Sequence, residues 1–331
     1  MTGVHLYKIE ADDVDLRLDR WFKQKFPDIS HGRLEKLLRT GQIRIDGRRV
    51  KANFRVSIGQ EVRVPPIGAT SSTKQVAVRN TKEPPNDILR KVLVNSVLHL
   101  DEEILAISKP PGVSVQGGTG TKEHIDGALD ALRFGSEWRP KLVHRLDKDT
   151  SGVLLLARTR HSAKWLTRAF REQVMDKTYW GIVVGDLRPV RGKIDLPIIK
   201  LPSRYGEKMI VDHKQGQRAI TDYAIVEQLG RRAAWIAMRP RTGRTHQLRV
   251  HMAALGTPIL GDGKYGGKTA FLDYQGLSRK MHLHARDIRL KRKDGTEIFV
   301  EAELPEHVKR SWMLLGMDNI SYKDPFVDLK D

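Results

Sequence analysis

The run Leu142-Val-His-Arg-Leu-Asp-Lys-Asp-Thr-Ser-Gly-Val-Leu-Leu-Leu-Ala157 places a polar segment between two short apolar ones. Leu142-Val143 and Val153–Ala157 are apolar runs bounded by turn residues, which predicts two strands of a buried sheet. Residues 148–152 supply the turn between them. A connection between two buried strands lies at the edge of the sheet, where functional side chains are usually presented. Asp147 is therefore a candidate site residue, although the local sequence supports equally well a carboxylate that only caps the turn.

The sequence around this run is rich in further strands. Helical spacing of apolar residues is confined here to two stretches, residues 163–174 and residues 248–255, and Gly256 ends the second. Since strands mostly follow strands, we expect an α+β fold with a mixed, mostly antiparallel sheet rather than a doubly wound one. The segments predicted as strands are residues 104–108, 179–184, 219–225 and 233–238.

The beginning of the chain predicts a small α/β module. Apolar residues at mostly helical spacing over residues 16–26 indicate one helix, and Ser30 is suited to cap a second helix that ends at Gly41. Asp46-Gly47 indicates a hairpin turn, with the return strand beginning at Val50. The module is expected to close with an apolar strand before two consecutive prolines.

We therefore expect three parts along the chain. The module spans residues 1–66, and residues 67–87 form a linker because they are rich in Ser, Thr, Pro, Lys and Gly and show no periodicity. Residues 88–331 form the larger, strand-rich domain. The chain of 331 residues is long enough for both domains to bury a core.

The charge balance indicates the partner. With 59 Lys and Arg against 40 Asp and Glu, the net charge is +19, and a protein this basic is expected to bind a polyanion, with nucleic acid as the default. The alternative is a basic charge kept only for solubility. The absence of cysteine excludes disulfides, thiolate metal sites and cysteine nucleophiles, and no apolar run is long enough to span a bilayer. We expect a cytoplasmic protein.

The module carries a basic stripe. Arg33, Lys36 and Arg39 recur at helical spacing, and further arginines extend the stripe onto the predicted hairpin. A stripe of this kind can follow phosphates, whereas the alternative is an ordinary solvated face. The candidate phosphate-binding residues are Arg33, Lys36, Arg39, Arg44, Arg48 and Arg49.

A second polar element is Thr242-Gly-Arg-Thr-His-Gln-Leu-Arg249. Thr245 is a suitable N-cap, so Arg249 is expected in the first turns of the helix that it begins. A carboxylate in a partly closed site must stay ionised, and a fixed guanidinium achieves this by charge pairing. The alternative is an exposed arginine on a basic surface.

Three patterns imitate known motifs. Residues 147–152 copy the start of a calcium-binding loop, but Arg158 stands where a bidentate Glu is required. Residues 261–266 satisfy G-x-G-x-x-G but follow a helix stop, and we expect no helix after them. We interpret the histidines as hydrogen-bonded structural residues rather than metal ligands, because no acidic third ligand is near. They are His246, His251, His282 and His284.

Several motifs together resemble the RluA family of pseudouridine synthases, most closely its large-subunit ribosomal branch, the RluC type. They are Ser108–Gly112, His144–Asp147 with Thr150–Gly152, Lys177–Tyr179, Gly243–His251, Pro258–Asp262 and Leu283–Ala285, in family order. The basic module resembles an S4 RNA-binding domain. The resemblance covers nearly the whole chain. Ser108 stands where the family usually has Asn, and Gln116 where relatives often have His.

The resemblance implies a pseudouridine synthase fold and roles for individual residues. It makes Asp147 the catalytic carboxylate, which either attacks C1′ or removes a proton from C2′. It makes Arg249 the partner that orients this carboxylate and Tyr179 the ring that stacks on the target uracil and handles the C5 proton. It makes Arg145 the residue that fills the stack left by the flipped uridine. Lys109, Arg244 and His246, within the matching motifs, are assigned to RNA contact.

The expected substrate is large-subunit ribosomal RNA, free or in an assembly intermediate, and the protein is expected to be a monomer that needs no metal, cofactor or membrane. One alternative is a non-catalytic ribosome-assembly protein, and another is a synthase that acts on tRNA. A nucleoside hydrolase would also use a carboxylate but usually needs a second one, for which Asp149 is the only close candidate.

Overall fold

The computed structural model describes residues 4–10, 13–26, 29–66, 87–117, 123–203, 206–292, 294–317 and 324–326. The chain divides into two compact units, Met1–Arg79 and Asn80–Asp331. The predicted linker lies outside the described residues, except that its last residue, Asp87, begins a helix. The domain boundaries proposed from the sequence thus stay a prediction.

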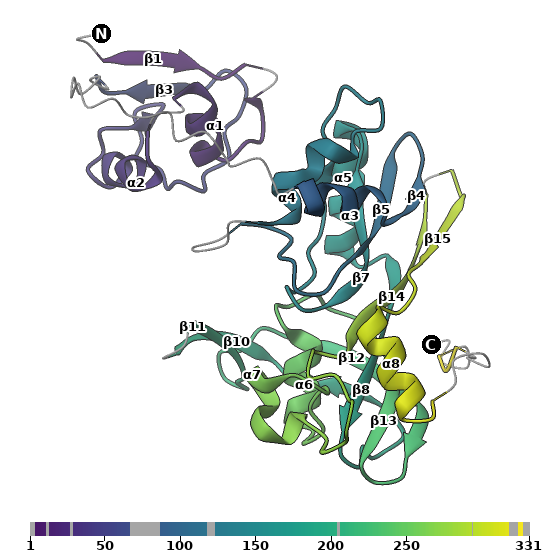
Figure 1. The fold of residues 1–331 in the computed structure, drawn as a ribbon. Helices are drawn as coiled ribbons and strands as arrows, with labels where there is room; N and C mark the ends of the chain where they lie inside the picture. The colour runs from purple at the N-terminus through teal and green to yellow at the C-terminus, as the bar shows by residue number, and fades with distance from the viewer. Residues whose placement is uncertain are drawn as a thin grey trace. The chain divides into compact units, whose positions relative to one another are not determined.

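Among the described residues of the first unit, an antiparallel sheet in the order β1-β3-β2 packs with two helices around an aromatic core (Figure 1). Trp21 and Phe22 are buried at the predicted spacing, and the indole of Trp21 donates a hydrogen bond to Asp13 at 3.0 Å. Ser30 caps the second helix by accepting a hydrogen bond from the amide of Arg33, as predicted. The elements are β1 His5–Lys8, α1 Leu18–Lys25, α2 His31–Arg39, β2 Arg44–Ile45 and β3 Glu61–Val64.

The hairpin predicted here closes at its turn, where Ile45 and Arg48 form an antiparallel bridge, but its return strand is wrong. Asp46-Gly47 does form a turn with positive φ at both residues, but no return strand starts at Val50 within residues 29–66. Instead, β2 pairs with β3, through Arg44 with Arg63 and Ile45 with Val62. The apolar side chain of Val62 is fully buried in this pairing, so core packing selects the more distant partner strand.

In the described part of the second unit, ten strands form one sheet in the order β4-β5-β7-β14-β8-β13-β12-β9, with β15 beside β14 and β6 beside β7. A separate hairpin, β10–β11, projects from this unit (Figure 1). The strands of the main sheet are β4 Val97–Leu100, β5 Ile104–Lys109, β6 Lys141–Leu142, β7 Ser151–Ala157, β8 Met175–Val184, β9 Arg191–Asp195, β12 Ile220–Leu229, β13 Ala233–Pro240, β14 Leu283–Lys291 and β15 Glu297–Glu301, and the hairpin is β10 Ile198–Ser203 with β11 Gly206–Val211.

Helices cover the two ends of the sheet. α3, α4 and α5 surround the β4–β5–β7 end, whereas α6, α7 and α8 lie with the β8–β13–β12 end (Figure 1). Among the described strands, all pairings are antiparallel except β7 with β14, so the structure confirms the predicted α+β class with a mixed, mostly antiparallel sheet. The helices are α3 Asp87–Val94, α4 Ile125–Ala128, η2 Leu129–Leu132, α5 Arg160–Glu172, α6 Gln247–Ala254, α7 Gly263–Gly266, η3 Gly267–Ala270 and α8 Glu306–Leu314.

The parallel contact between β7 and β14 lies where the polar turn enters the sheet. It involves only Ser151 with His284 and Gly152 with Ala285. Gly152 has φ +106°, and a Cβ there would lie 2.1 Å from the carbonyl oxygen of Ala285, so only glycine fits this close approach. The approach fixes the start of β7, and with it the turn that carries Asp147.

No helix in the described residues is long and apolar enough to cross a membrane.

Candidate active site

A cavity of about 290 Å³ opens where three chain segments meet. The segments are the β6–β7 turn with Asp147, the strand β8 with Tyr179, and the connection from β13 into α6 with Arg249. These residues are more than thirty positions apart in sequence. The sheet therefore brings together the three residues that the family resemblance singled out.

Asp147 lies on the turn with its carboxylate directed to the cavity. Its backbone carbonyl, rather than its carboxylate, accepts the hydrogen bond from the amide of Thr150 that closes the turn, at 3.2 Å. The side chain is 17% exposed and lies within ion-pair distance of two groups of the α6 segment. Its carboxylate is thus available to the cavity.

His144 anchors the same turn. Its Nε2 accepts a hydrogen bond from the amide of Leu155 in β7 at 2.8 Å, and its ring stacks on Phe170 of α5 with centroids 4.1 Å apart. Burial lowers the pKa of His144 to about 3, and the charge of nearby Lys177 acts in the same direction. The imidazole is therefore a neutral structural group at physiological pH.

Lys109 is a correction to the predicted RNA contacts. It is fully buried at the end of β5, and its ammonium donates to the carbonyl oxygens of Pro110, Val113 and Lys148 at 2.7, 2.8 and 2.9 Å. Burial lowers the pKa of Lys109 to about 7, against the opposing charge of Asp149. Lys109 therefore supports the loop beneath the cavity and is not on a surface that RNA could reach.

Arg249 connects two carboxylates. Its Nε and Nη2 donate to the two oxygens of Asp262 at 2.7 and 2.8 Å, and its Nη1 lies 3.5 Å from Oδ2 of Asp147. Burial alone would lower the pKa of Arg249, but the hydrogen bonds and charge of Asp262, with the charge of Asp147, raise it above its ordinary value. A bidentate, buried pair holds the guanidinium in one orientation. The expected pairing of Arg249 with Asp147 is present, but Asp262 is the closer partner.

The helix that carries Arg249 begins one residue later than predicted. The residue preceding α6 is His246, not Thr245, and His246 has φ +54°, in the left-handed region. Its side chain does not cap the helix. This backbone conformation is uncommon for a residue with a Cβ, and such residues are often found at functional sites as well as in turns.

His246 lies between Asp147 and Tyr265. Its Nδ1 is 2.6 Å from the hydroxyl oxygen of Tyr265, and its Nε2 is 3.7 Å from Oδ1 of Asp147. The amide of Met209 donates to the same phenol oxygen at 3.3 Å, which favours the arrangement in which the phenol donates to Nδ1 and a neutral imidazole carries its proton on Nε2. Burial lowers the pKa of His246 below 6.5 against the opposing charge of Asp147, which favours this neutral form.

Gln247 fastens the segment that carries His246 to the sheet. Its amide nitrogen donates to the carbonyl of Ile220 at 2.8 Å and to the hydroxyl of Thr221 at 3.0 Å. Its side-chain oxygen accepts from the hydroxyl of Thr242 at 2.6 Å. Because Gln247 is buried and its donors and acceptor are all used, the loop before α6 is held in one conformation.

Tyr179 lines the cavity from β8. Burial, followed by the charge of Asp147, raises the pKa of Tyr179 above its usual value near 10. Lys177, two residues earlier on the same strand face, also lines the cavity, and its Nζ lies 5.9 Å from the ring centre of Phe170. Burial lowers the pKa of Lys177. The wall opposite Asp147 is thus aromatic and cationic.

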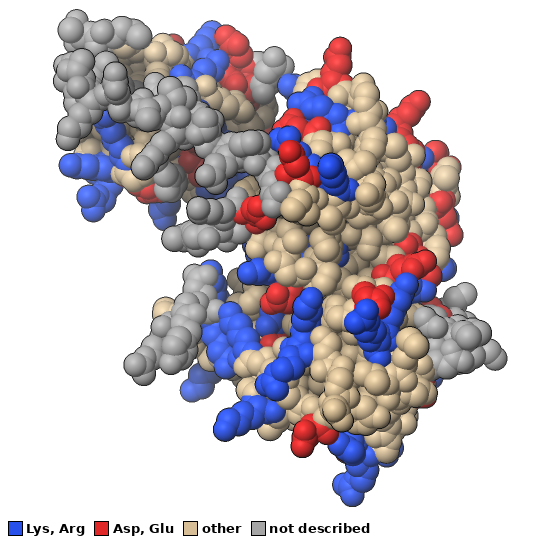
Figure 2. Space-filling view, viewed as in Figure 1, with Lys and Arg blue, Asp and Glu red and all other residues tan. Residues whose placement is uncertain are grey.

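The remaining predicted RNA contacts fall into two groups. Arg145 and Arg244 are exposed residues that line the cavity. The cations of the N-terminal unit are on the other body, where Lys and Arg side chains project from the part that carries α2 (Figure 2). Of these, Arg44 is half-buried and donates to the carbonyls of Gly41 and Gly47 at 3.1 Å each, so part of its donor capacity is used inside the module.

The other predicted structural histidines are hydrogen-bonded, as expected. His251, His282 and His284 each lie within 3.0 Å of a hydroxyl oxygen and also contact a backbone carbonyl. Their hydroxyl partners are Thr221, Ser311 and Ser151, respectively. Across the described ranges, no group of three or more His, Cys, Asp or Glu side chains is arranged to hold a metal ion.

Sequence reasoning missed Asp262 and Tyr265 because their segment was interpreted as turn-forming glycines. That prediction was wrong in one respect, since a one-turn helix, α7, begins at Gly263 with the carboxylate of Asp262 as its N-cap. The signal was present, because Asp262 ends the matching motif at residues 258–262. Only the fold shows that it faces Arg249.

Residues 103–254 match the RNA pseudouridylate synthase family, and residues 16–62 match the S4 domain. A ribosomal large subunit pseudouridine synthase C of Rickettsia prowazekii is 36% identical over 301 residues, which cover 90% of this chain and 96% of that protein. The chain belongs to the RNA pseudouridylate synthase family. It is an RNA pseudouridine synthase with an N-terminal S4 domain.

Two further relatives agree with this assignment. The synthase C of Vibrio parahaemolyticus is 31% identical over 320 residues, covering 96% of this pseudouridine synthase and 97% of the relative. The solved structure of human RNA pseudouridylate synthase domain containing 4 has a TM-score of 0.58 and 30% identity, and covers 70% of this chain and 97% of its own. The predicted family, enzyme class and S4 domain are thus confirmed.

Proposed function

We propose that this synthase converts uridines of large-subunit ribosomal RNA to pseudouridine, with Asp147 as the catalytic carboxylate. The reaction breaks the N1–C1′ bond, turns the uracil and forms a C5–C1′ bond, while the C5 proton leaves to solvent and N1 takes up a proton. The observation that carries the proposal is the pairing of Asp147 with the buried Arg249 in the cavity. The substrate class is supported by relatives in two organisms that are named ribosomal large subunit pseudouridine synthase C.

Arg249 acts on the reaction through Asp147. Attack on C1′ and removal of the C2′ proton both require an ionised carboxylate close to the ribose. The guanidinium lies 3.5 Å from the Asp147 carboxylate, and its bidentate bond to Asp262 fixes where the positive charge lies beside it. Arg249 and Asp262 are therefore positioning residues.

Tyr179 supplies a neutral ring. Its raised pKa keeps the phenol protonated at physiological pH, which disfavours a phenolate base in the free enzyme and favours stacking on the uracil with the hydroxyl as a donor. The predicted role in handling the C5 proton then requires that the hydroxyl passes on its own proton as it accepts another. Both roles of Tyr179 stay proposals.

The cavity accepts one extruded nucleotide. Its volume of about 290 Å³ is at the lower end of the range of small-molecule pockets, so a stacked base pair does not fit. A uridine must leave its stack to reach Asp147, and Arg145 is the exposed side chain beside the cavity that can fill the vacated space. We assign Arg244 and His246 to the RNA contacts around the extruded nucleotide.

The experiment that tests this function is tritium release from transcripts carrying 5-tritiated uridine. Large-subunit rRNA, small-subunit rRNA and tRNA are compared, with Asp147→Asn as the matched control. Release by the wild type from large-subunit rRNA alone supports the proposal, and release from tRNA alone contradicts the substrate class. Tight binding of all RNAs without release indicates a non-catalytic binding protein, and free uracil indicates a hydrolase.

A further inference from the structure

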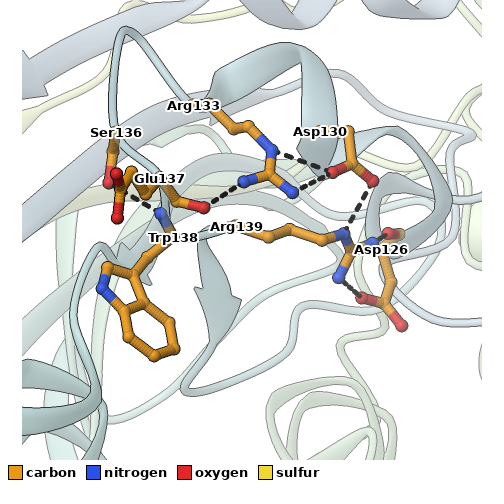
Figure 3. Close-up of polar contacts among 7 residues, drawn as sticks. All are labelled: Asp126, Asp130, Arg133, Ser136, Glu137, Trp138 and Arg139. Carbon is orange, nitrogen blue, oxygen red and sulfur yellow. Dashed lines mark hydrogen bonds and ion pairs between the residues drawn. The ribbon is translucent and has the colours of Figure 1, made fainter.

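A rigid surface loop, residues 133–139, lies outside the cavity on the same unit. Arg133 donates through Nε and Nη2 to Oδ1 of Asp130 at 3.1 and 2.9 Å, and Arg139 donates through Nε to Oδ2 of the same residue at 3.0 Å. Arg139 also reaches Asp126 at 3.3 Å. Figure 3 shows these guanidinium groups converging on the two carboxylates. The network fixes the loop at both ends.

The same loop presents an aromatic ring to solvent. Trp138 is 46% exposed, and its indole is directed away from the Asp126–Asp130 cluster (Figure 3). The guanidinium of Arg160 lies 4.5 Å from the ring centre. An exposed indole costs free energy in water, and here it is held out by a braced loop rather than folded inward. This arrangement is a preformed stacking platform with a cation on it.

Arg160 begins a stripe of cations along α5. At 3.6 residues per turn, Arg160, Lys164, Arg168 and Arg171 fall within an arc of about 80° on one helix face. The opposite face carries the residues of α5 that are buried against the sheet. All four cations are exposed, and the acidic side chain paired with them, Glu172, lies at the C-terminal end of the stripe, 2.8 Å from Arg168.

The C-terminal end of α5 lies at the catalytic cavity. Phe170, near the end of α5, lines that cavity and stacks on His144 of the catalytic turn. From Arg160 to Phe170 the helix rises about 15 Å, because each residue adds 1.5 Å. With about 3.4 Å per nucleotide along a stacked strand, this length corresponds to roughly four nucleotides.

We propose that α5 and Trp138 form a second RNA-contact surface, along which the strand leaving the cavity runs, with phosphates against the cations of α5 and a base stacked on Trp138. A single RNA strand is bound by cations that contact its phosphates together with an aromatic ring on which a base stacks. A partner protein with an acidic surface would contact the cations but would make no use of the exposed indole. The proposal rests on the RNA substrate proposed above and extends the contact beyond the extruded nucleotide.

The test measures binding and turnover on one large-subunit rRNA transcript, with the full chain. Trp138→Ala removes the ring, and Lys164→Gln/Arg168→Gln removes two cations. We expect Trp138→Ala to weaken the Kd about tenfold, as loss of one base–aromatic stack does. The double variant is expected to lower the slope of log K against log salt by about 1.4, at ~0.7 per phosphate contact. Turnover at saturating RNA stays at the wild-type value in both.

The controls are matched pairs on the same unit. Phe299→Ala removes an aromatic ring that is 51% exposed with Arg289 at 5.2 Å, and Lys309→Gln/Arg310→Gln removes two surface cations of α8. Trp138→Phe keeps a stacking ring and is expected to bind nearly as the wild type does. If the α5 and Trp138 variants bind RNA no more weakly than these controls, the proposal is wrong.

A second measurement places the contact and separates the two proposals. Photocrosslinking with 5-bromouridine transcripts should yield adducts on the peptides that carry residues 133–139 or α5. Absence of tritium release from any RNA would contradict the proposed function, whereas crosslinks and the binding comparison report on α5 independently of turnover. Crosslinks confined to the cavity and the N-terminal unit would overturn the inference.

Discussion

Arginines occupy short helices in both units of this synthase, but their surroundings differ. On α2 of the N-terminal unit, Arg33 and Arg39 are exposed. Each is next in sequence to a buried leucine of the core, Leu34 and Leu38 respectively. On α6 of the second unit, Arg249 is 7% exposed and bonded to Asp262. Exposed cations are screened by salt and can adapt to any phosphate, whereas a buried, paired cation keeps its orientation. We propose that the first arrangement supplies affinity for RNA and that the second prepares the Asp147 carboxylate for chemistry.

If this division holds, changes in the cavity alter turnover and changes on α2 alter binding. The largest effect on turnover is expected for Asp147→Asn, which preserves the shape of the side chain but removes its charge. Turnover should fall by about 10³-fold or more, since the loss of a positioned acid–base or nucleophilic group has effects of this size. RNA affinity, measured by filter binding, should stay within about twofold of the wild type. Retained tritium release would remove Asp147 from the centre of the mechanism.

The next largest effect is expected when the cation beside Asp147 is removed together with its partner. Arg249→Met alone leaves Asp262 buried without a counter-ion, which costs about 3–5 kcal/mol of stability. Arg249→Met/Asp262→Asn avoids that charge and should fold, as thermal unfolding would show.

In this double variant we expect turnover to fall about 10- to 100-fold, as loss of a hydrogen bond to a charged group would produce. Asp262→Asn alone is the matched control, because it keeps the guanidinium and loses part of its orientation, and its turnover should be intermediate. Equal turnover in the double variant and the wild type would show that Arg249 is only structural.

A smaller effect on turnover is expected for His246. His246→Gln removes the ionisable ring that lies between Asp147 and Tyr265, and we expect about a tenfold loss of turnover, roughly the size of one hydrogen bond. The pKa of His246 is below 6.5, so the imidazole is neutral at pH 7 and becomes protonated only as the pH falls. Protonation turns Nδ1 into a donor, so its hydrogen bond with the Tyr265 hydroxyl reverses direction. The acid limb of the wild-type pH–rate profile should therefore carry an inflection that is missing in His246→Gln.

The smallest effect on turnover is expected on α2. Arg33→Gln/Lys36→Gln/Arg39→Gln removes exposed cations and should leave turnover at saturating RNA unchanged. The Kd should weaken, and the slope of log K against log salt should fall by about 2–3, at ~0.7–0.9 for each phosphate contact. The α8 double variant Lys309→Gln/Arg310→Gln, which removes two charges rather than three, shows the effect of lost surface charge elsewhere on the protein. A loss of turnover in the α2 variant would contradict the division between affinity and chemistry.

The elements predicted best were those with strong local patterns. α5 and α6 have a long apolar period or a clear glycine stop, and β7, β13 and the second half of β8 are mostly apolar runs. The pairing of β2 was predicted wrongly although its local signal was strong. Asp46-Gly47 is a strong turn signal, but the choice between a near and a distant partner strand depends on how Val62 packs in the core.

Site residues followed the same rule. Asp147, Tyr179 and Arg249 each lie within a motif, so their segments could be recognised one by one. Lys109 also lies in a motif, but the motif did not show that its ammonium is buried among three carbonyl groups. One of these carbonyls belongs to Lys148 on another loop, which only the fold brings close. A motif shows that a residue belongs to the site without showing which way it faces.

By itself, the sequence determined the α+β class, the S4 region, the enzyme family and the segment that presents Asp147. The α+β class follows from periodicity and turn residues, which are properties of neighbouring residues. The S4 region, the enzyme family and the role of the Asp147 segment follow from the resemblance of the sequence's motifs to a known family. The tertiary structure alone decided that Arg249 is shared between Asp147 and Asp262, and that His246 lies between Asp147 and Tyr265. Such contacts join residues up to about a hundred positions apart, and their geometry is set by how β7, β8 and β14 pack together, which no local pattern encodes.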